Sequence, residues 1–218
     1  MLFFFVIRNN IIKLAKYYNI SYKKCIIMKR IAIFASGNGS NAENIIRYFK
    51  EKESAAEVCL VVCNRKEAGV YERCQRLGVD ILHVPKAEIN SIEKMLPILE
   101  NYSIDYIVLA GFMLMIPEFL LERFPRRIVN IHPSLLPKFG GKGMNGHHVH
   151  AAVVAAGEKE SGITIHYVNE FCDEGEIIFQ ASVPVLKSDT PEDVENKIHD
   201  LEKKHFPRVI EEIVKTDK

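Results

Sequence analysis

The chain has 218 residues, with 29 basic and 28 acidic side chains and a formal net charge of +1. This length is enough for one large α/β domain with a full core, and the balanced charge gives no electrostatic case for a nucleic acid or a membrane surface as partner. The five cysteines include no C-x-x-C pair, so we expect free thiols in a reducing cytoplasm.

The first 27 residues differ in character from those that follow. Residues 1–7 are apolar, but they are too short to span a membrane and lack the basic region and cleavage site of a signal peptide. A strong apolar run begins just after Met28. We expect residues 1–27 to be an N-terminal extension outside the catalytic fold, with Met28 as the functional start and residues 28–218 as a single domain.

The first half of the chain alternates apolar runs typical of buried strands with amphipathic helical patterns. Strands are predicted at residues 31–35, 58–63, 81–84 and 106–110, and helices after residue 41, at 68–77 and at 91–102. Ser40 and Glu43 have the S-x-x-E spacing of a capping box at the start of the first helix. The alternation predicts a doubly wound, mostly parallel, Rossmann-like sheet.

A glycine-rich turn joins the first strand to the first helix. Gly37, Gly39 and Ala42 have the spacing G-x-G-x-x-A, and the free N–H groups of such a turn bind anions. Dinucleotide sites share this spacing, but they carry an acidic residue at the end of the second strand, where this chain has Asn64. The turn therefore favours the single phosphate of a mononucleotide; a dinucleotide site and a merely structural turn are the alternatives.

Two apolar stretches follow in the middle of the chain. Residues 109–117 form either core or a slot for a flat aromatic ligand. Residues 128–131 alternate as a strand that runs into a loop with two prolines, which holds Asn130 and His132 at a strand end on one face. An amide beside an imidazole suits a developing oxyanion, although the pair could equally satisfy backbone groups.

A glycine-rich stretch leads to three histidines at residues 147, 148 and 150. Their spacing is not a usual one for zinc, and no nearby cysteine or carboxylate completes a ligand set. We expect a flexible loop over a site, without a metal.

The C-terminal part changes to an antiparallel pattern. Two β-rich runs at 164–168 and 177–185 enclose a loop with Asp173, and His166 could face that carboxylate and relay protons, although most such aspartates only make turns. Thr190 and Pro191 then start a long C-terminal helix, which Pro207 is expected to kink or end.

Five motifs together resemble the phosphoribosylglycinamide formyltransferases, folate-dependent enzymes of purine synthesis. They are SGNGSN at 36–41, LAGFM at 109–113, NIHPSLLPKF at 130–139, GITIHYVNEFCDEG at 162–175 and LEKKHFP at 201–207. The resemblance covers residues 28–214. It implies transfer of the formyl group of 10-formyltetrahydrofolate to the amine of 5'-phosphoribosylglycinamide by direct acyl transfer, with no metal.

The resemblance also implies a role for individual residues. The catalytic residues of the family fall on Asn130, His132 and Asp173. Its ribonucleotide site falls on Gly39, Ser40, Asn41, His199, Asp200, Leu201 and Glu202. Its folate site falls on Met113, Leu114, Met115, Ile116, Asn130, Asn169, Glu170, Phe171, Cys172 and Asp173. Without the resemblance, Glu202 would be placed on a solvated helix face.

The chain departs from the family pattern in three places. It has a glycine-rich insertion between Lys138 and His150, it has no arginine at 91–94 for the folate glutamate tail, and Cys172 replaces an aliphatic residue. The first two departures leave folate contacts there unassigned.

Other functions stay open beside this one. Methionyl-tRNA formyltransferase would add a tRNA-binding domain and a basic surface, and formyltetrahydrofolate deformylase would add an N-terminal regulatory domain. A non-catalytic mononucleotide-binding protein would need only the glycine turn. We expect a cytoplasmic enzyme of small molecules, monomeric or homodimeric, without nucleic acid or membrane partners.

Overall fold

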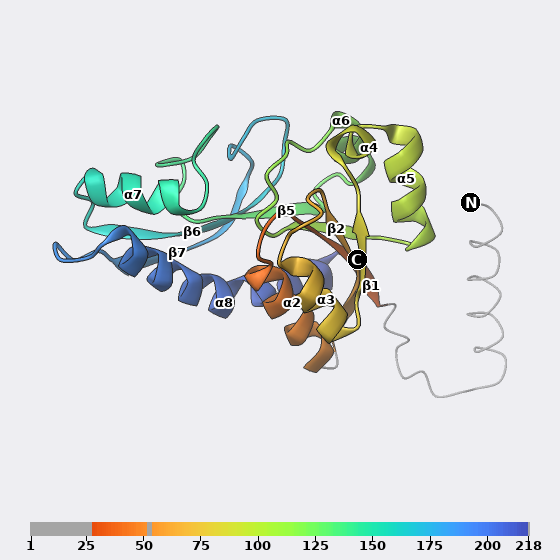
Figure 1. Ribbon diagram of the computed structural model, residues 1–218, viewed down its shortest axis with the longest axis horizontal. Coiled ribbons are helices and arrows are strands. Elements are labelled where there is room, and N and C mark those ends of the chain that lie inside the picture. Colours follow the sequence, from red (N-terminus) through yellow and green to blue (C-terminus); the bar gives the residue numbers. More distant parts are fainter. Residues whose placement is uncertain (1–27, 52–53, 218) are drawn as a thin grey trace.

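The computed structural model describes residues 28–51 and 54–217. The expected extension at residues 1–27 lies outside these ranges. The described residues form a seven-stranded sheet in the order β3-β2-β1-β4-β5-β6-β7 (Figure 1). Its strands are β1 (Lys29–Ala35), β2 (Ala56–Cys63), β3 (Asp80–His83), β4 (Tyr106–Leu109), β5 (Ile128–His132), β6 (Glu160–Tyr167) and β7 (Ile177–Pro184).

The first five strands are parallel, and the last two are antiparallel. This confirms the prediction of a mostly parallel α/β sheet with an antiparallel C-terminal addition. The β5–β6 register places Asn130 opposite His166 and His132 opposite Thr164. Two distant segments of the chain therefore meet at the end of β5.

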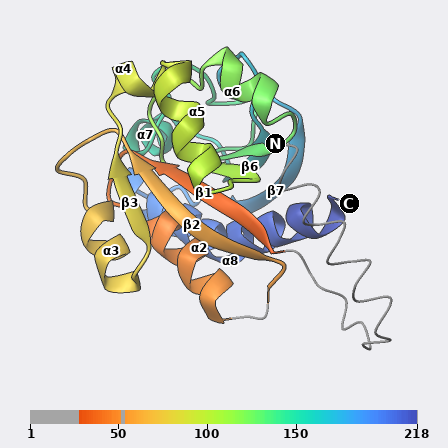
Figure 2. The ribbon, with the colours of Figure 1, turned by 90° about the vertical axis from the view of Figure 1, so that its right-hand side faces the viewer.

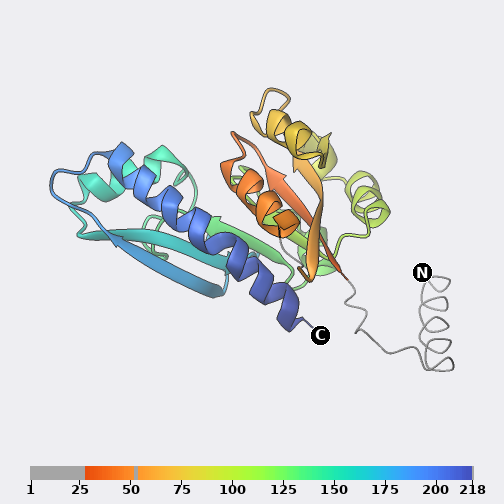
Figure 3. The ribbon, with the colours of Figure 1, turned by 90° about the horizontal axis from the view of Figure 1, so that it is seen from below.

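Helices cover both faces of the sheet (Figures 2 and 3). They are α2 (Ser40–Glu51), α3 (Val70–Leu77), α4 (Lys86–Ile89), α5 (Ile92–Asn101), α6 (Glu118–Arg123), α7 (His147–Ala155) and α8 (Pro191–Thr216). Helices α2, α3 and α8 lie on one face and α4, α5 and α6 on the other, while α7 packs beside α8.

Each face has its own core because side chains alternate across a strand. In β1, Ile31 and Ile33 pack with residues of α2 and α8, whereas Ala32 and Phe34 pack with residues of α5 and α6. All four side chains are fully buried. A strand buried on both faces explains the continuous apolar run of the sequence.

The long helix α8 begins as predicted and ends later than predicted. Thr190 caps it through a capping box with Asp193, and Pro191 occupies the first turn. A kink or an end is expected at Pro207, and of these the end is wrong, since the helix continues to Thr216. Proline leaves the carbonyl four residues earlier without its helical partner, and here Asn44 Nδ2 donates to that Lys203 oxygen at 3.0 Å.

Two further local predictions are wrong. Ser40 is already the first helical residue of α2, so it does not cap the helix, and the Glu43 side chain bonds instead to Arg47, Arg73 and Arg76.

Residues 147–150 begin helix α7 rather than forming a loop. Val149 and His150 are buried and anchor this turn in the fold.

Candidate active site

A cavity of about 840 Å³ opens at the carboxyl ends of β1, β4 and β5. Its wall comes from the glycine turn after β1, residues 110–115 after β4, residues 130–133 of β5 and its loop, the glycine-rich segment 141–146, Cys172 and Asp173, and one face of α8. Ligands of open α/β sheets bind at this edge. The cavity therefore brings together both halves of the chain.

The glycine turn forms one end of the cavity. Gly37, Gly39, Ser40 and Asn41 all line it. Gly39 has a φ of 79°, and a Cβ there would lie 2.6 Å from Val70 Cγ2, so only glycine fits. The turn leads directly into α2, whose first N–H groups have no partner within the helix.

Asn130 and His166 form a hydrogen-bonded pair at the end of β5. His166 Nδ1 lies 2.9 Å from the Tyr167 carbonyl oxygen, which only accepts, so Nδ1 carries the proton. The Nε2 atom of His166 then accepts from Asn130 Nδ2 at 3.1 Å. Burial lowers the pKa of His166, which keeps the ring neutral and preserves this arrangement.

Asp173 lies at the centre of the polar groups. Its Oδ1 is 3.5 Å from Asn130 Nδ2 and 3.8 Å from His166 Nε2. Its Oδ2 is 3.5 Å from His132 Nδ1 and accepts from the Gly141 amide at 2.9 Å. The structure thus brings together all four residues for which the sequence predicts acid–base or oxyanion chemistry.

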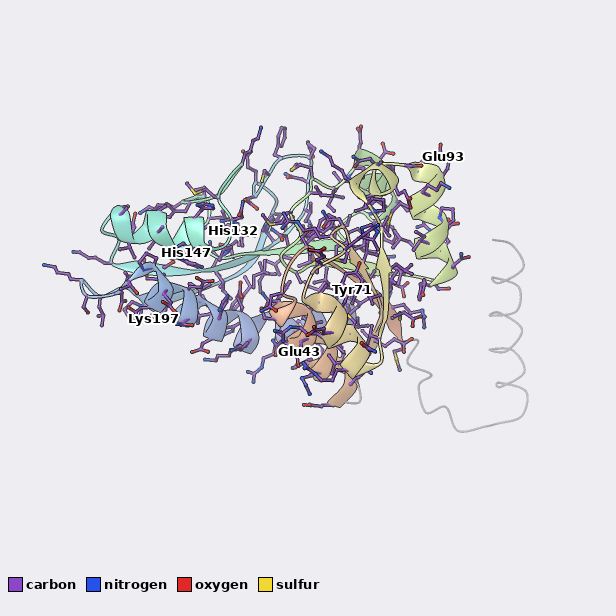
Figure 4. All side chains as sticks on the ribbon, in the orientation of Figure 1. Glu43, Tyr71, Glu93, His132, His147 and Lys197 are labelled. Atoms are coloured by element: carbon purple, nitrogen blue, oxygen red, sulfur yellow. The ribbon has the colours of Figure 1, made fainter. Side chains whose placement is uncertain are left out.

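His132 is buried, and Figure 4 shows it beside the start of α7. Its Nε2 atom lies 2.8 Å from the Phe139 carbonyl oxygen, so Nε2 carries a proton and donates. The other nitrogen, Nδ1, faces Asp173.

The predicted aromatic slot forms part of the cavity wall. Met113, Leu114 and Met115 line the cavity, and the two methionines are 45% and 54% exposed. Ile116 is buried in the core and does not line it. Ser36 Oγ accepts a hydrogen bond from the Met113 amide at 2.9 Å and donates to Asn64 Oδ1 at 2.6 Å. Ser36 and Asn64 therefore hold the slot in place, a role that the sequence did not predict for them.

The predicted folate loop reaches the cavity only at its end. Cys172 and Asp173 line the cavity, whereas Asn169, Glu170 and Phe171 do not. Phe171 is 57% exposed, and its amide donates to Asn169 Oδ1 at 3.1 Å within the loop.

Helix α8 contributes one face to the cavity. Residues Glu195, Ile198, His199 and Glu202 line it at spacings that fall on one side of a helix. Glu202 accepts from Asn41 Nδ2 at 2.9 Å, and burial raises its pKa. Of the predicted segment, Asp200 and Leu201 point elsewhere: neither lines the cavity, and Asp200 is exposed.

Sequence reasoning missed other wall residues, among them Lys86, Asn90, His150, Glu195 and Ile198. The helical spacing of Glu195 and Ile198 to Glu202 was the signal that could have found them. Among residues 28–51 and 54–217, no three His, Cys, Asp or Glu side chains are grouped as metal ligands. In the same ranges, no helix is long and apolar enough to cross a membrane.

The fold and the cavity define an α/β protein with a cavity at the carboxyl edge of its sheet, where an amide, two histidines and a carboxylate lie close together. The formyl transferase family model matches residues 29–210. The chain belongs to the formyl transferase family.

The chain is similar to phosphoribosylglycinamide formyltransferases of plants and bacteria, and also to the trifunctional purine biosynthetic protein adenosine-3 of Drosophila melanogaster. It is 40% identical to the chloroplastic phosphoribosylglycinamide formyltransferase of Arabidopsis thaliana over 84% of this chain and 64% of that protein. It is 39% identical to the phosphoribosylglycinamide formyltransferase of Bacillus subtilis over 86% of this chain and 95% of that protein. The chain thus spans less than two thirds of the plant relative and nearly all of the bacterial one.

Solved structures agree with this similarity. Glycinamide ribonucleotide transformylase 1 from Geobacillus kaustophilus aligns with a TM-score of 0.78 and 38% identity over 86% of this chain and 99% of that one. The corresponding enzyme from Symbiobacterium toebii gives a TM-score of 0.78 and 36% identity over 86% and 88%.

Proposed function

We propose that this protein transfers the formyl group of 10-formyltetrahydrofolate to the amine of 5'-phosphoribosylglycinamide, a step of purine biosynthesis. The observation that carries the proposal is the position of Asp173, within 3.8 Å of polar atoms of Asn130, His132 and His166. This group of side chains lies between an anion-binding turn and an apolar slot. A transfer between a phosphorylated acceptor and an aromatic donor needs both.

The ribonucleotide is placed along the glycine turn and α8. Its phosphate binds the N–H groups at Gly39, Ser40 and Asn41, where the dipole of α2 favours an anion. Its amine lies toward Glu202, whose carboxylate is already tied to Asn41. His199, one turn before Glu202 on the same face of α8, contacts the ribose side of the ligand.

The folate is placed in the slot of Met113, Leu114 and Met115. The backbone of this segment pairs with the polar edge of the pterin, and the thioether side chains pack on its face. The loop that ends at Cys172 and Asp173 closes over the other side. This orientation brings the formyl group to Asn130.

The chemistry is direct acyl transfer. The amine attacks the formyl carbon, and the oxyanion that forms is stabilised by the Asn130 amide and by protonated His132. Asp173 then passes protons from the attacking amine to the folate nitrogen, through water or through Nε2 of His166, which carries no proton of its own. The formyl group on an aromatic amine is already activated, so the mechanism uses no metal.

The test is the reaction itself with a matched pair of variants. Purified protein is given glycinamide ribonucleotide and 10-formyltetrahydrofolate, and folate absorbance is followed. Asn130→Ala should lower kcat about 100- to 1,000-fold, roughly 3–4 kcal/mol, because one oxyanion donor is lost. Asn196→Ala, on the exposed face of α8, is the control and should keep normal turnover.

Two results would contradict the proposal. Folate turnover without the ribonucleotide would indicate a deformylase, and near-normal rates in Asn130→Ala would remove Asn130 from the site. We further propose that the enzyme works in the cytoplasm on these two small molecules, as a monomer or homodimer, and size-exclusion chromatography with light scattering measures that state.

A further inference from the structure

An arginine outside the cavity holds the glycine turn. Arg73, on α3, donates from Nε to the Asn38 main-chain oxygen at 2.7 Å and from Nη2 to the Asn38 side-chain oxygen at 3.1 Å. Asn38 lies between Gly37 and Gly39, at the tip of the turn. One guanidinium thus binds both oxygens of this residue. Such a two-point contact fixes orientation as well as distance.

The same helix fixes the residues on either side of Asn38. The Val70 amide donates to the Gly37 carbonyl at 3.2 Å. The Val70 side chain packs so closely on Gly39 that a Cβ at Gly39 would lie 2.6 Å from it. The start of α3 therefore holds three consecutive residues of the turn.

Glu43 fixes the arginine in turn. Figure 4 shows Glu43 where α2 and α3 lie together. Its carboxylate bonds to Arg73, to Arg47 at 2.8 Å and to Arg76 at 2.7 Å. Hydrogen bonds from these arginines lower the pKa of Glu43 to about 2, against the opposing effect of burial. The carboxylate is therefore charged whenever the enzyme would be at work.

The orientation of Asn38 decides what the turn offers to an anion. A carbonyl oxygen turned into the cavity would repel a phosphate, whereas N–H groups attract it. Arg73 keeps both Asn38 oxygens on the side of α3. The N–H groups after Gly39 are then left for the ligand.

We propose that Arg73 positions the turn that binds the phosphate of the ribonucleotide, without contacting the ribonucleotide itself. It acts through Asn38, and Arg47 and Arg76 do not share the role because they reach only Glu43. This inference rests on the proposed function. It adds that the start of α3, through Arg73, sets the affinity of the glycine turn for the phosphate.

The test compares two variants of Arg73 with a matched control. Arg73→Gln removes the charge, and Arg73→Lys keeps the charge but cannot bind Asn38 at two points. Arg76→Gln removes an arginine from the same carboxylate without touching Asn38. Thermal melting of all three shows whether each variant is folded.

The kinetic readout separates positioning from structural support. Both Arg73 variants should raise the KM for glycinamide ribonucleotide about 10- to 100-fold, with kcat and the KM for the folate near normal. With the dephosphorylated nucleoside as acceptor, kcat/KM should be the same in wild type and variants. Arg76→Gln should resemble wild type with both acceptors.

Equal losses with the phosphorylated and dephosphorylated acceptors would overturn the inference, because a merely structural role lowers both. A loss in Arg76→Gln as large as in Arg73→Gln would also overturn it. Calorimetric binding of ribose 5-phosphate gives a readout without turnover, and it should weaken in the Arg73 variants alone. If wild type binds ribose 5-phosphate but formylates nothing, the proposed function fails while this test of Arg73 still stands.

Discussion

Asp173 is the residue on which the other polar groups of the site converge. It has a φ of 60°, which few residues other than glycine, asparagine and aspartate adopt readily. This backbone conformation turns the carboxylate so that one oxygen faces Asn130 and His166 and the other faces His132 and Gly141. Strain at such a position is typical of functional sites.

Asp173→Asn tests this carboxylate without disturbing the backbone, because asparagine tolerates the same φ. We expect normal folding and a fall in kcat of about 100- to 10,000-fold, the usual cost of losing a positioned acid or base. Turnover and thermal melting are the measurements. Glu176→Gln, an exposed carboxylate after the same loop, is the control, and equal losses in both variants would contradict a specific role for Asp173.

His150 makes stability depend on pH. It is buried in α7 near Glu195, His199, His147 and His132, and burial lowers its pKa from 6.5 to about 4. The unfolded chain therefore binds a proton before the folded one does, so stability is full above pH 6.5 and falls as the pH drops toward 4. The loss amounts to about 3 kcal/mol.

The variant His150→Leu should remove this dependence. Its free energy of unfolding should fall less than that of wild type between pH 7 and pH 4.5, as measured by urea denaturation at both values. His148→Gln, on the exposed side of the same helix, should behave as wild type does. Parallel curves for His150→Leu and wild type would assign the pH dependence to other groups.

The sequence predicted the reactive side chains better than the groups that hold them. Asn130, His132 and Asp173 stand out through the family motifs, because by spacing alone the first two could equally satisfy backbone groups and an aspartate in such a loop usually makes a turn. Ser36 and Gly141 do not stand out in this way. Ser36 accepts a hydrogen bond from the main-chain N–H group of Met113, and Gly141 donates its own main-chain N–H group to Asp173. Such contacts depend on which segments meet in space, and residue type does not reveal that.

Among the helices, α8 shows how tertiary contacts change a local prediction. Pro207 predicts a helix end, yet Asn44 of α2 bonds to the carbonyl that proline leaves free. Similarly, the S-x-x-E spacing predicts a cap at Ser40, but three arginines from two helices compete for Glu43. Before α7 the glycine-rich stretch predicts a loop that includes the three histidines, but residues 147–150 are helical, with Val149 and His150 buried.

The capping box of α8 can be tested alone. Thr190 Oγ1 accepts from the Asp193 amide at 3.2 Å, and Asp193 Oδ2 accepts from the Thr190 amide at 2.8 Å. Thr190→Ala should lower the free energy of unfolding by about 1 kcal/mol. Urea denaturation measures it, with the exposed Ser188→Ala as control. An unchanged midpoint would mean that packing alone holds the start of the helix.

On the scale of the whole molecule, the cavity joins two parts of different architecture. The parallel part supplies the glycine turn and the slot of Met113 to Met115, and the antiparallel part supplies Asp173 and α8. The alternation of strands and helices was enough to predict the parallel part. That both parts share one cavity was implied only by the family resemblance, because local patterns do not reveal how α8 packs across the sheet.

A ligand that spans both parts should stabilise them together. Glycinamide ribonucleotide at about 100 times its Kd should raise the free energy of unfolding by about 2.7 kcal/mol, in a single calorimetric transition. Gly39→Ala should abolish the rise, because a Cβ there meets Val70 and the φ of 79° is unfavourable. Two calorimetric transitions, of which the ligand raises the midpoint temperature of only one, would show that the two parts unfold separately.

The two faces of the sheet are completed at different times during synthesis. The buried residues of the core beneath α5 and α6 all come from residues 32–128, whereas the opposite core needs Val194, Ile198 and Phe206 of α8 beside Ile31 and Ile33 of β1. The ribosome releases the chain from its N-terminus, and apolar surface that is exposed before a domain is complete favours aggregation. The residues of one core are therefore all made early, while the opposite side of β1, which α2 covers in part, waits for α8, the last helix of the described residues. Until then that face is open to chaperones and to aggregation.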